Sequence, residues 1–196
     1  MKVAITIPAM SQEMIDAAVN ALRNERMSLG DSVFKFEQEF AQMCGARRAI
    51  AVSSGTHALQ LAIEALGIRR KSTIITSPMS FIASANAIVH AGCVPRFCDI
   101  DDKTYAMDAG KLKRRITTKT TAVIPVHLYG YPCAMDEIMA VAKEKNLMVI
   151  EDACQAHGAV YKGKNAGAIG DVGCFSFYAT KNMTVGGDGG MIITNN

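Results

Sequence analysis

Short apolar segments with the pattern of β-strands alternate along this sequence with longer segments of helical spacing, and this alternation limits the possible folds more than any other feature. The strand pattern occurs at residues 48–52, 73–77, 94–99, 121–126, 147–151, 173–177 and 191–194. The helical spacing occurs at residues 11–24, 32–43, 57–66, 82–91 and 135–145. Such alternation predicts an α/β fold in which helices cover both faces of a mainly parallel sheet.

Length and composition indicate a single globular domain. Of the 196 residues, 49% are hydrophobic and 20% are charged, which is enough apolar material for a core. This balance excludes a disordered, collagen-like or coiled-coil chain. The net charge of +3 is too small to indicate a nucleic-acid partner. Because no stretch approaches the roughly 18 apolar residues of a membrane helix, we also expect no membrane partner.

The N-terminus and the cysteines both favour a cytoplasmic protein. Residues 1–7 hold one Lys and a short apolar run that ends at Pro8, which is not the pattern of a signal peptide. The six cysteines form no CxxC pair, and several lie in apolar segments. This distribution favours buried thiols over disulfides or a zinc site. We therefore expect neither disulfides nor a metal ion.

The first candidate site is the segment Ser53-Ser54-Gly55-Thr56, between a predicted strand and a predicted helix. Ligands of open α/β sheets gather at the carboxyl ends of the strands, where this segment is expected. Its small residues leave the helix N-terminal amides open, and Thr56 adds a hydroxyl, which suits a phosphate group. The alternative is that a Ser or Thr here only caps the helix.

Two more candidates follow other predicted strands. Asp152 and Gln155 come after segment 147–151, where a carboxylate can hold a positively charged ligand. The alternative is an acidic strand end or a helix cap. Phe81 comes after segment 73–77, where an aromatic ring can stack on a planar cofactor. The alternative for Phe81 is packing in the core.

Lys181 is the candidate nucleophile. Aromatic and hydroxyl side chains precede it, and the glycine-rich segment 185–190 follows it. Glycines permit close backbone approach to a ligand, and a lysine in such surroundings can become a nucleophile. The segment precedes a strand, so it is not a dinucleotide fingerprint, which follows one. The alternative is an ordinary solvated lysine. A phosphate cradle, a carboxylate, a stacking ring and a lysine are the parts that a pyridoxal phosphate site needs.

With these parts in place, the sequence resembles the DegT/DnrJ/EryC1/StrS family of sugar aminotransferases, of the fold-type I pyridoxal phosphate class. The resemblance covers nearly the whole chain in the family's order. The matching stretches are MSLGDSVFKFEQEFA, SSGTHALQLAIEALGI, TSPMSFIASANAIVHAGCVPRFCDID, PVHLYGYP, VIEDACQAHGAVYKGK and FSFYATKNMTVGGDGGMIITN. It implies a seven-stranded, mainly parallel sheet in which segment 191–194 runs antiparallel.

The resemblance also implies roles for single residues. Lys181 matches the lysine that forms a Schiff base with pyridoxal 5'-phosphate. Asp152 matches the aspartate paired with the pyridine nitrogen, and Gln155 the glutamine near the ring hydroxyl. Phe81 matches the aromatic side chain that stacks on the ring. The family's phosphate-binding positions correspond to Gly55, Thr56 and Ser176.

The implied activity is transfer of an amino group from an amino acid, expected to be glutamate, to a nucleotide-linked keto sugar. Family members are homodimers and are longer than this chain. Residues 1–196 would therefore be the cofactor-binding large domain, an N-terminal part of a longer enzyme without its C-terminal small domain. One departure is GGDGG at residues 186–190, where GEGG is more usual.

Three alternatives stay open at this point. Another fold-type I enzyme, such as an amino-acid aminotransferase or a cysteine desulfurase, would share the same cofactor chemistry. A non-catalytic protein could bind pyridoxal phosphate for regulation or assembly. A nicotinamide-binding protein is disfavoured because no GxGxxG follows an early strand. Sugar dehydratases related to the family carry His where this sequence has Lys181, which argues against that branch.

Overall fold

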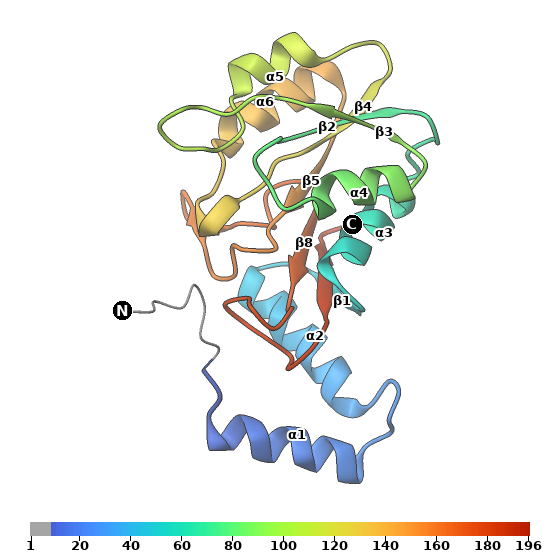
Figure 1. The fold of residues 1–196 in the computed structure, drawn as a ribbon, viewed down its shortest axis with the longest axis vertical. Coiled ribbons are helices and arrows are strands. Elements are labelled where there is room, and N and C mark those ends of the chain that lie inside the picture. The colour runs from blue at the N-terminus through green and yellow to red at the C-terminus, as the bar shows by residue number, and fades with distance from the viewer. Residues whose placement is uncertain (1–8) are drawn as a thin grey trace.

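One seven-stranded sheet forms the centre of the computed structural model, which describes residues 9–196 (Figure 1). Its strands are, in spatial order, β1 Arg48–Val52, β9 Gly190–Thr194, β8 Val172–Ser176, β5 Met148–Asp152, β4 Thr120–Ile124, β2 Thr73–Thr76 and β3 Val94–Phe97. Strand β9 pairs antiparallel with β1 and β8, and all other pairs in this sheet are parallel. The predicted fold class and the antiparallel strand at 191–194 are both confirmed.

The five predicted helices are all present, and a sixth, short helix joins them. The helices are α1 Gln12–Asn24, α2 Asp31–Cys44, α3 Gly55–Ala65, α4 Ala83–His90, α5 Ala109–Arg115 and α6 Met135–Lys145. Helix α5 was not predicted because seven residues are too few for an apolar period to be visible. The structure also contains the 3₁₀ turn Leu128–Gly130 and a small hairpin of β6 Val160–Tyr161 and β7 Lys164–Asn165.

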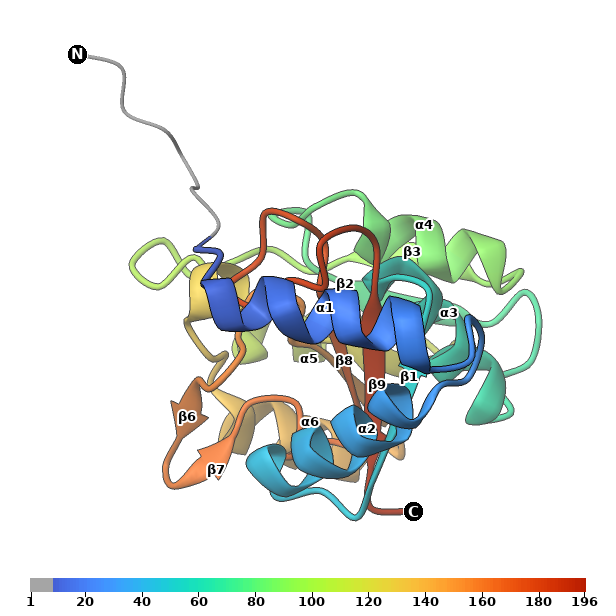
Figure 2. The same cartoon turned by 90° about the horizontal axis from the view of Figure 1, so that it is seen from below.

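The strands β2, β4, β5 and β8 are buried on both faces of the sheet, to which successive residues of a strand point in turn. Ile74 and Ile150 belong to the core beneath α3 and α4, whereas their neighbours Ile75 and Val149 belong to the core beneath α5 and α6. Figure 2 shows α4 on one side of the strands and α6 on the other. The apolar strand segments therefore lack the polar alternation of a solvent-facing sheet.

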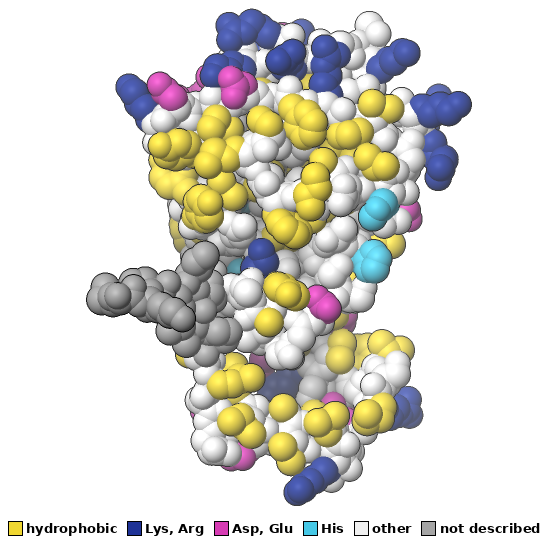
Figure 3. Space-filling view, in the orientation of Figure 1, with side chains coloured by type: hydrophobic (Ala, Val, Ile, Leu, Met, Phe, Trp, Pro, Cys, Tyr) yellow, Lys and Arg dark blue, Asp and Glu magenta, His cyan; other side chains and the backbone are white. Residues whose placement is uncertain are grey.

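The two ends of the molecule differ in their side chains. Helix α5 carries Lys113, Arg114 and Arg115 in its last turn, and Lys and Arg side chains gather at that end in Figure 3. At the other end, α1 lies apart from the sheet in Figure 1 and has no buried residue.

Among residues 9–196, no helix is both long and apolar enough to cross a membrane.

All six cysteines are free thiols, and five of them are buried; Cys154 is partly exposed. The interpretation of the cysteines as mainly buried thiols is therefore confirmed. The interpretation of residues 1–7 as a segment without signal-peptide character concerns residues outside those that the structure describes.

Candidate active site

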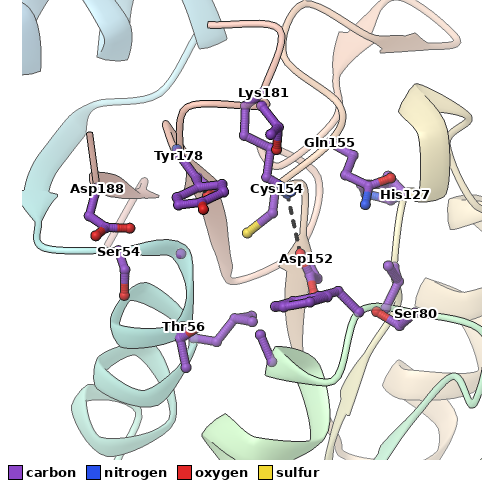
Figure 4. Close-up of a pocket in the computed structure, with 17 residues that line it drawn as sticks. Ser54, Thr56, Ser80, His127, Asp152, Cys154, Gln155, Tyr178, Lys181 and Asp188 are labelled. Atoms are coloured by element: carbon purple, nitrogen blue, oxygen red, sulfur yellow. Dashed lines mark hydrogen bonds between the residues drawn. The ribbon is translucent and has the colours of Figure 1, made fainter. Parts of the chain in front are cut away.

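All seven residues that the sequence analysis selected line one cavity of about 420 Å³. They are Gly55, Thr56, Phe81, Asp152, Gln155, Ser176 and Lys181. The cavity lies where β5 and β8 end and α3 begins, and Figure 4 shows labelled side chains from β5, α3 and the loop after β8 around a common space. This is the edge at which open α/β sheets bind ligands, because the carboxyl ends of parallel strands meet there.

The N-terminus of α3 is seated directly against the end of β8. A Cβ atom on Gly55 would lie 2.7 Å from both Cys154 Sγ and Ser176 Cβ, so only glycine permits this approach. Ser54 caps the helix, since its side chain accepts a hydrogen bond from the His57 amide at 3.2 Å. The first amides of a helix have no partner within it and favour an anion. Capping by Ser54 and an open cradle at Gly55 and Thr56 therefore occur together.

The glycine-rich segment before β9 completes this close packing. A Cβ atom on Gly190 would lie 2.4 Å from the carbonyl carbon of Ser54. The end of the segment thus passes directly over the start of α3, which explains why glycine is needed there. Asp188, in the same segment, is exposed and lines the cavity near Ser54 (Figure 4).

Asp152 ends β5 with its side chain held on two sides. Its Oδ2 accepts a hydrogen bond from Ser84 Oγ at 2.6 Å, and its Oδ1 accepts one from the Cys154 amide at 3.2 Å (Figure 4, dashed line). The side chain is nearly buried, with 5% of the residue exposed, and borders the cavity. A carboxylate fixed in this way can hold a positively charged group of a ligand.

Gln155 is oriented by a backbone amide. Its Oε1 accepts a hydrogen bond from the Tyr129 amide at 2.9 Å, which leaves the Nε2 group as a donor for a ligand. Tyr129 has a φ of +54°, in the left-handed region that favours glycine. Such strain costs on the order of 1 kcal/mol and is often found at functional sites. The sequence analysis did not select Tyr129, because no local pattern marks this conformation in a tyrosine.

Lys181 lies in the loop between β8 and β9. Its amide donates to the Tyr178 carbonyl at 2.8 Å, and the Phe177 amide donates to the Gly189 carbonyl at 2.8 Å, which closes the base of the loop. The lysine is partly buried and borders the cavity. Within residues 9–196, no salt bridge includes its ammonium group.

Phe81 lies at the rim of the cavity and is 67% exposed. The alternative in which Phe81 packs in the core is therefore wrong. An exposed ring beside a cavity can cover a flat ligand that enters it.

A buried hydrogen-bonded pair next to the site was missed from the sequence. His127 and Glu151 are both fully buried, and His127 Nε2 lies 2.8 Å from Glu151 Oε2. His127 Nδ1 accepts the Cys133 amide at 3.1 Å, so Nε2 carries the proton and donates to Glu151. The available signal was the adjacent pair Glu151-Asp152, whose side chains a strand sends to opposite faces.

Glu151 also accepts hydrogen bonds from three backbone amides of one loop. They come from Gly167 at 2.9 Å, Ile169 at 2.7 Å and Gly170 at 2.6 Å. Burial acts to raise the pKa of Glu151, but these bonds and the one from His127 hold it below its usual range. The pair therefore joins this loop and the segment around His127 to β5.

The remaining chemistry of the cavity is limited. Burial raises the pKa of the Cys154 thiol well above its usual value, so it is not a reactive thiolate. Within the described part of the chain, no cluster of three or more His, Cys, Asp or Glu side chains has the geometry of a metal site.

Comparison with known proteins agrees with this arrangement. A profile of the DegT/DnrJ/EryC1/StrS aminotransferase family matches residues 8–196. GDP-perosamine synthase of Caulobacter vibrioides is 47% identical over 168 residues, which are 86% of this chain and 45% of that protein. The spore coat polysaccharide biosynthesis protein SpsC of Bacillus subtilis is 45% identical over 190 residues, 97% of this chain and 49% of that protein.

A solved structure gives the same result for the fold. The aminotransferase from Psychrobacter cryohalolentis has 42% sequence identity and a TM-score of 0.93, over 96% of this chain and 48% of that one. The chain thus spans about half the length of the relatives it matches. The chain belongs to the DegT/DnrJ/EryC1/StrS aminotransferase family.

Proposed function

We propose that this protein is a pyridoxal-phosphate-dependent aminotransferase that moves an amino group from an amino acid to a nucleotide-linked keto sugar. The observation that carries the proposal is the convergence of Lys181, Asp152 and the α3 N-terminus on one cavity. Each of the three comes from a different strand end, so their meeting is a property of the fold. Residues 1–196 are, in this proposal, the cofactor-binding large domain.

The cavity fits the cofactor in its chemistry. The cradle at Gly55 is too tight for a Cβ atom, and its helix amides and the Ser176 hydroxyl suit a phosphate group. Asp152 offers a carboxylate for a protonated ring nitrogen, Gln155 an amide donor for the ring hydroxyl, and Phe81 an exposed ring for the cofactor's face. Bound pyridoxal phosphate would supply an electron sink that stabilises a carbanion at the substrate.

Lys181 has two tasks in this proposal. Its Nζ atom would hold the cofactor covalently. As a free amine, Nζ would be the base that takes up the proton of the donor's α-carbon. Proton transfer by a positioned side chain contributes typically about 10²- to 10⁴-fold to a rate. Asp152 would hold the ring nitrogen in place and compensate its positive charge.

The substrate class rests on the relatives. GDP-perosamine synthase is named for a nucleotide-linked amino sugar, and SpsC for polysaccharide biosynthesis. We infer a nucleotide-linked keto sugar as the amino acceptor, glutamate as the donor and a homodimer as the assembly. The two other fold-type I activities and the non-catalytic binder each predict a different outcome in the experiments below.

The test compares amino acceptors in the protein, in Lys181→Ala and in the control Lys164→Ala. Lys164 is an exposed lysine of β7 and does not line the cavity. We expect amination of a nucleotide-linked keto sugar by the unaltered protein and by Lys164→Ala, and none by Lys181→Ala.

Three other outcomes would contradict the proposal. Faster amination of simple keto acids would indicate an amino-acid aminotransferase. Release of sulfide from cysteine would indicate a desulfurase. Binding of the cofactor without its conversion by glutamate would indicate a binding protein.

A further inference from the structure

Ser84, in the first turn of α4, makes the shorter of the two hydrogen bonds to the Asp152 side chain, at 2.6 Å. It is 1% exposed and is not among the residues that line the cavity. Ser84 therefore does not face the cavity directly. Its hydroxyl nevertheless touches the carboxylate that faces the ligand.

The hydrogen bonds around Ser84 run in one direction. A serine hydroxyl has a single proton, and that of Ser84 is donated to Asp152 Oδ2. Ser80 Oγ lies 2.7 Å from Ser84 Oγ, so Ser80 must be the donor of that pair. The result is a relay in which Ser80 donates to Ser84 and Ser84 donates to Asp152.

This relay connects two different walls of the cavity. Ser80 lines the cavity and is the neighbour of Phe81, in the loop between β2 and α4. Asp152 belongs to β5, which is separated from β2 by β4. The position of the exposed aromatic ring and that of the carboxylate are thus coupled through two hydroxyl groups.

We propose that Ser84 is a positioning residue, which fixes the Asp152 carboxylate toward the cofactor's ring nitrogen and the Phe81 loop toward the ring's face. The proposal rests on the proposed function, because it assumes that the ring occupies this cavity. Ser84 reaches the ring nitrogen only through the Asp152 carboxylate, so most of its effect on affinity must disappear when Asp152 can no longer act as a carboxylate.

The first test measures the affinity of the protein for pyridoxal phosphate. The chain contains no Trp, so emission of the bound cofactor can be followed without overlap from Trp. We expect Ser84→Ala to weaken binding about 10-fold, the lower end for a hydrogen bond to a charged group. The NMR signal of the ring nitrogen in isotopically labelled cofactor should also shift, because its carboxylate partner is displaced.

A matched control separates positioning from loss of structure. Ser77 is a buried serine before the same loop. Among residues 9–196, its hydroxyl bonds only to Met79, whose amide donates to it at 3.1 Å. Ser77→Ala should leave both the affinity and the ring-nitrogen signal unchanged. Equal effects of Ser77→Ala and Ser84→Ala would overturn the proposal, since they would indicate a general loosening of the loop.

The second test adds Ser84→Ala to Asp152→Asn and compares the changes in affinity as a double-mutant cycle. We expect the 10-fold effect of Ser84→Ala to fall below about 2-fold in this background. An undiminished effect would overturn the proposal, because Ser84 would then act by another route. Normal cofactor binding together with an unaltered ring-nitrogen signal in Ser84→Ala would overturn the proposed role of Ser84, but not the proposed function. Absence of binding in the unaltered protein would overturn the proposed function, and this inference with it.

Discussion

Glu151 and Asp152 are consecutive carboxylates at the end of β5, yet their surroundings are opposite in kind. Glu151 is fully buried, and its two oxygens accept four hydrogen bonds, three of them from backbone amides. Asp152 borders the cavity and accepts two, one of them from the hydroxyl of Ser84. One strand therefore carries, in adjacent positions, a carboxylate that is enclosed by protein and a carboxylate that faces a cavity.

The difference lies in the partners as well as in their number. A backbone N–H group can only donate, so the groups around Glu151 require a side chain that accepts hydrogen bonds through both of its end atoms, as a carboxylate does. A hydroxyl can donate or accept, so the Asp152 cluster tolerates a change of side chain. We infer that Glu151 serves the stability of the loops around the site, whereas Asp152 serves the ligand. The predictions below test this division, from the largest expected effect to the smallest.

Glu151→Gln should produce the largest loss of stability. Its amide nitrogen would face a backbone amide as donor against donor, and a buried donor left without an acceptor costs about 1–3 kcal/mol. Urea unfolding measures the loss. The matched control is Glu144→Gln, which removes an exposed pairing with Lys113 and Lys145 and should cost at most about 1 kcal/mol. Equal stability losses in the two variants would contradict a structural role of Glu151.

Asp152→Asn should show the reverse pattern. The free energy of unfolding should change by less than about 1 kcal/mol, because the Ser84 hydroxyl can turn to accept from the new amide. Turnover should fall about 10²- to 10³-fold, the usual cost of removing one electrostatic stabiliser from an active site. Steady-state kinetics and urea unfolding of the same preparation measure both. A variant that is unstable but active would refute the division of roles.

Acid should destabilise the protein through Glu151. Its pKa is lower in the folded protein than the ordinary value of 4.5, so its contribution to stability is present above that value. The contribution is lost as the pH falls below 4.5 through the folded pKa. The loss should be smaller than that of Glu151→Gln, because a protonated carboxyl keeps acceptor capacity. Between pH 6 and pH 3, the free energy of unfolding should fall more steeply with pH in the unaltered protein than in Glu151→Gln. The same pH dependence in both proteins would count against this assignment.

Gln155→Glu should have the smallest effect. The new side chain keeps the oxygen that accepts the Tyr129 amide, so stability should stay within about 0.5 kcal/mol. It loses the amide donor that faces the cavity, and cofactor affinity should fall about 5- to 10-fold, equivalent to one hydrogen bond. Cofactor titration measures the change. Unaltered affinity would mean that Gln155 does not donate to the cofactor.

The sheet was predictable because its signal is periodic. Strand segments such as β1 and helices such as α6 have the bounds that their apolar patterns predicted. Helix α5 and the β6–β7 hairpin were missed because elements of seven and two residues carry no period. Their formation depends on packing between distant segments, which a local pattern does not contain.

The candidate site was predictable for a related reason. Residues that follow the strands meet at one edge of a parallel sheet, so the sequence alone indicates that Asp152 and Lys181 lie near each other. The partner of Glu151 was not predictable, because His127 lies 24 residues away along the chain and meets it only through space. The contact of Ser84 with Asp152 was not predicted for the same reason, because 68 residues separate the two.

The central claim is that Lys181 is the lysine that binds the cofactor in this cavity. The most direct measurement is to incubate the protein with pyridoxal phosphate, reduce the covalent bond with borohydride and map the modified peptide by mass spectrometry. The account predicts one label, on Lys181, which is absent from Lys181→Ala and retained in Lys164→Ala. Labels spread over the surface lysines, or a single label on another lysine, would contradict it.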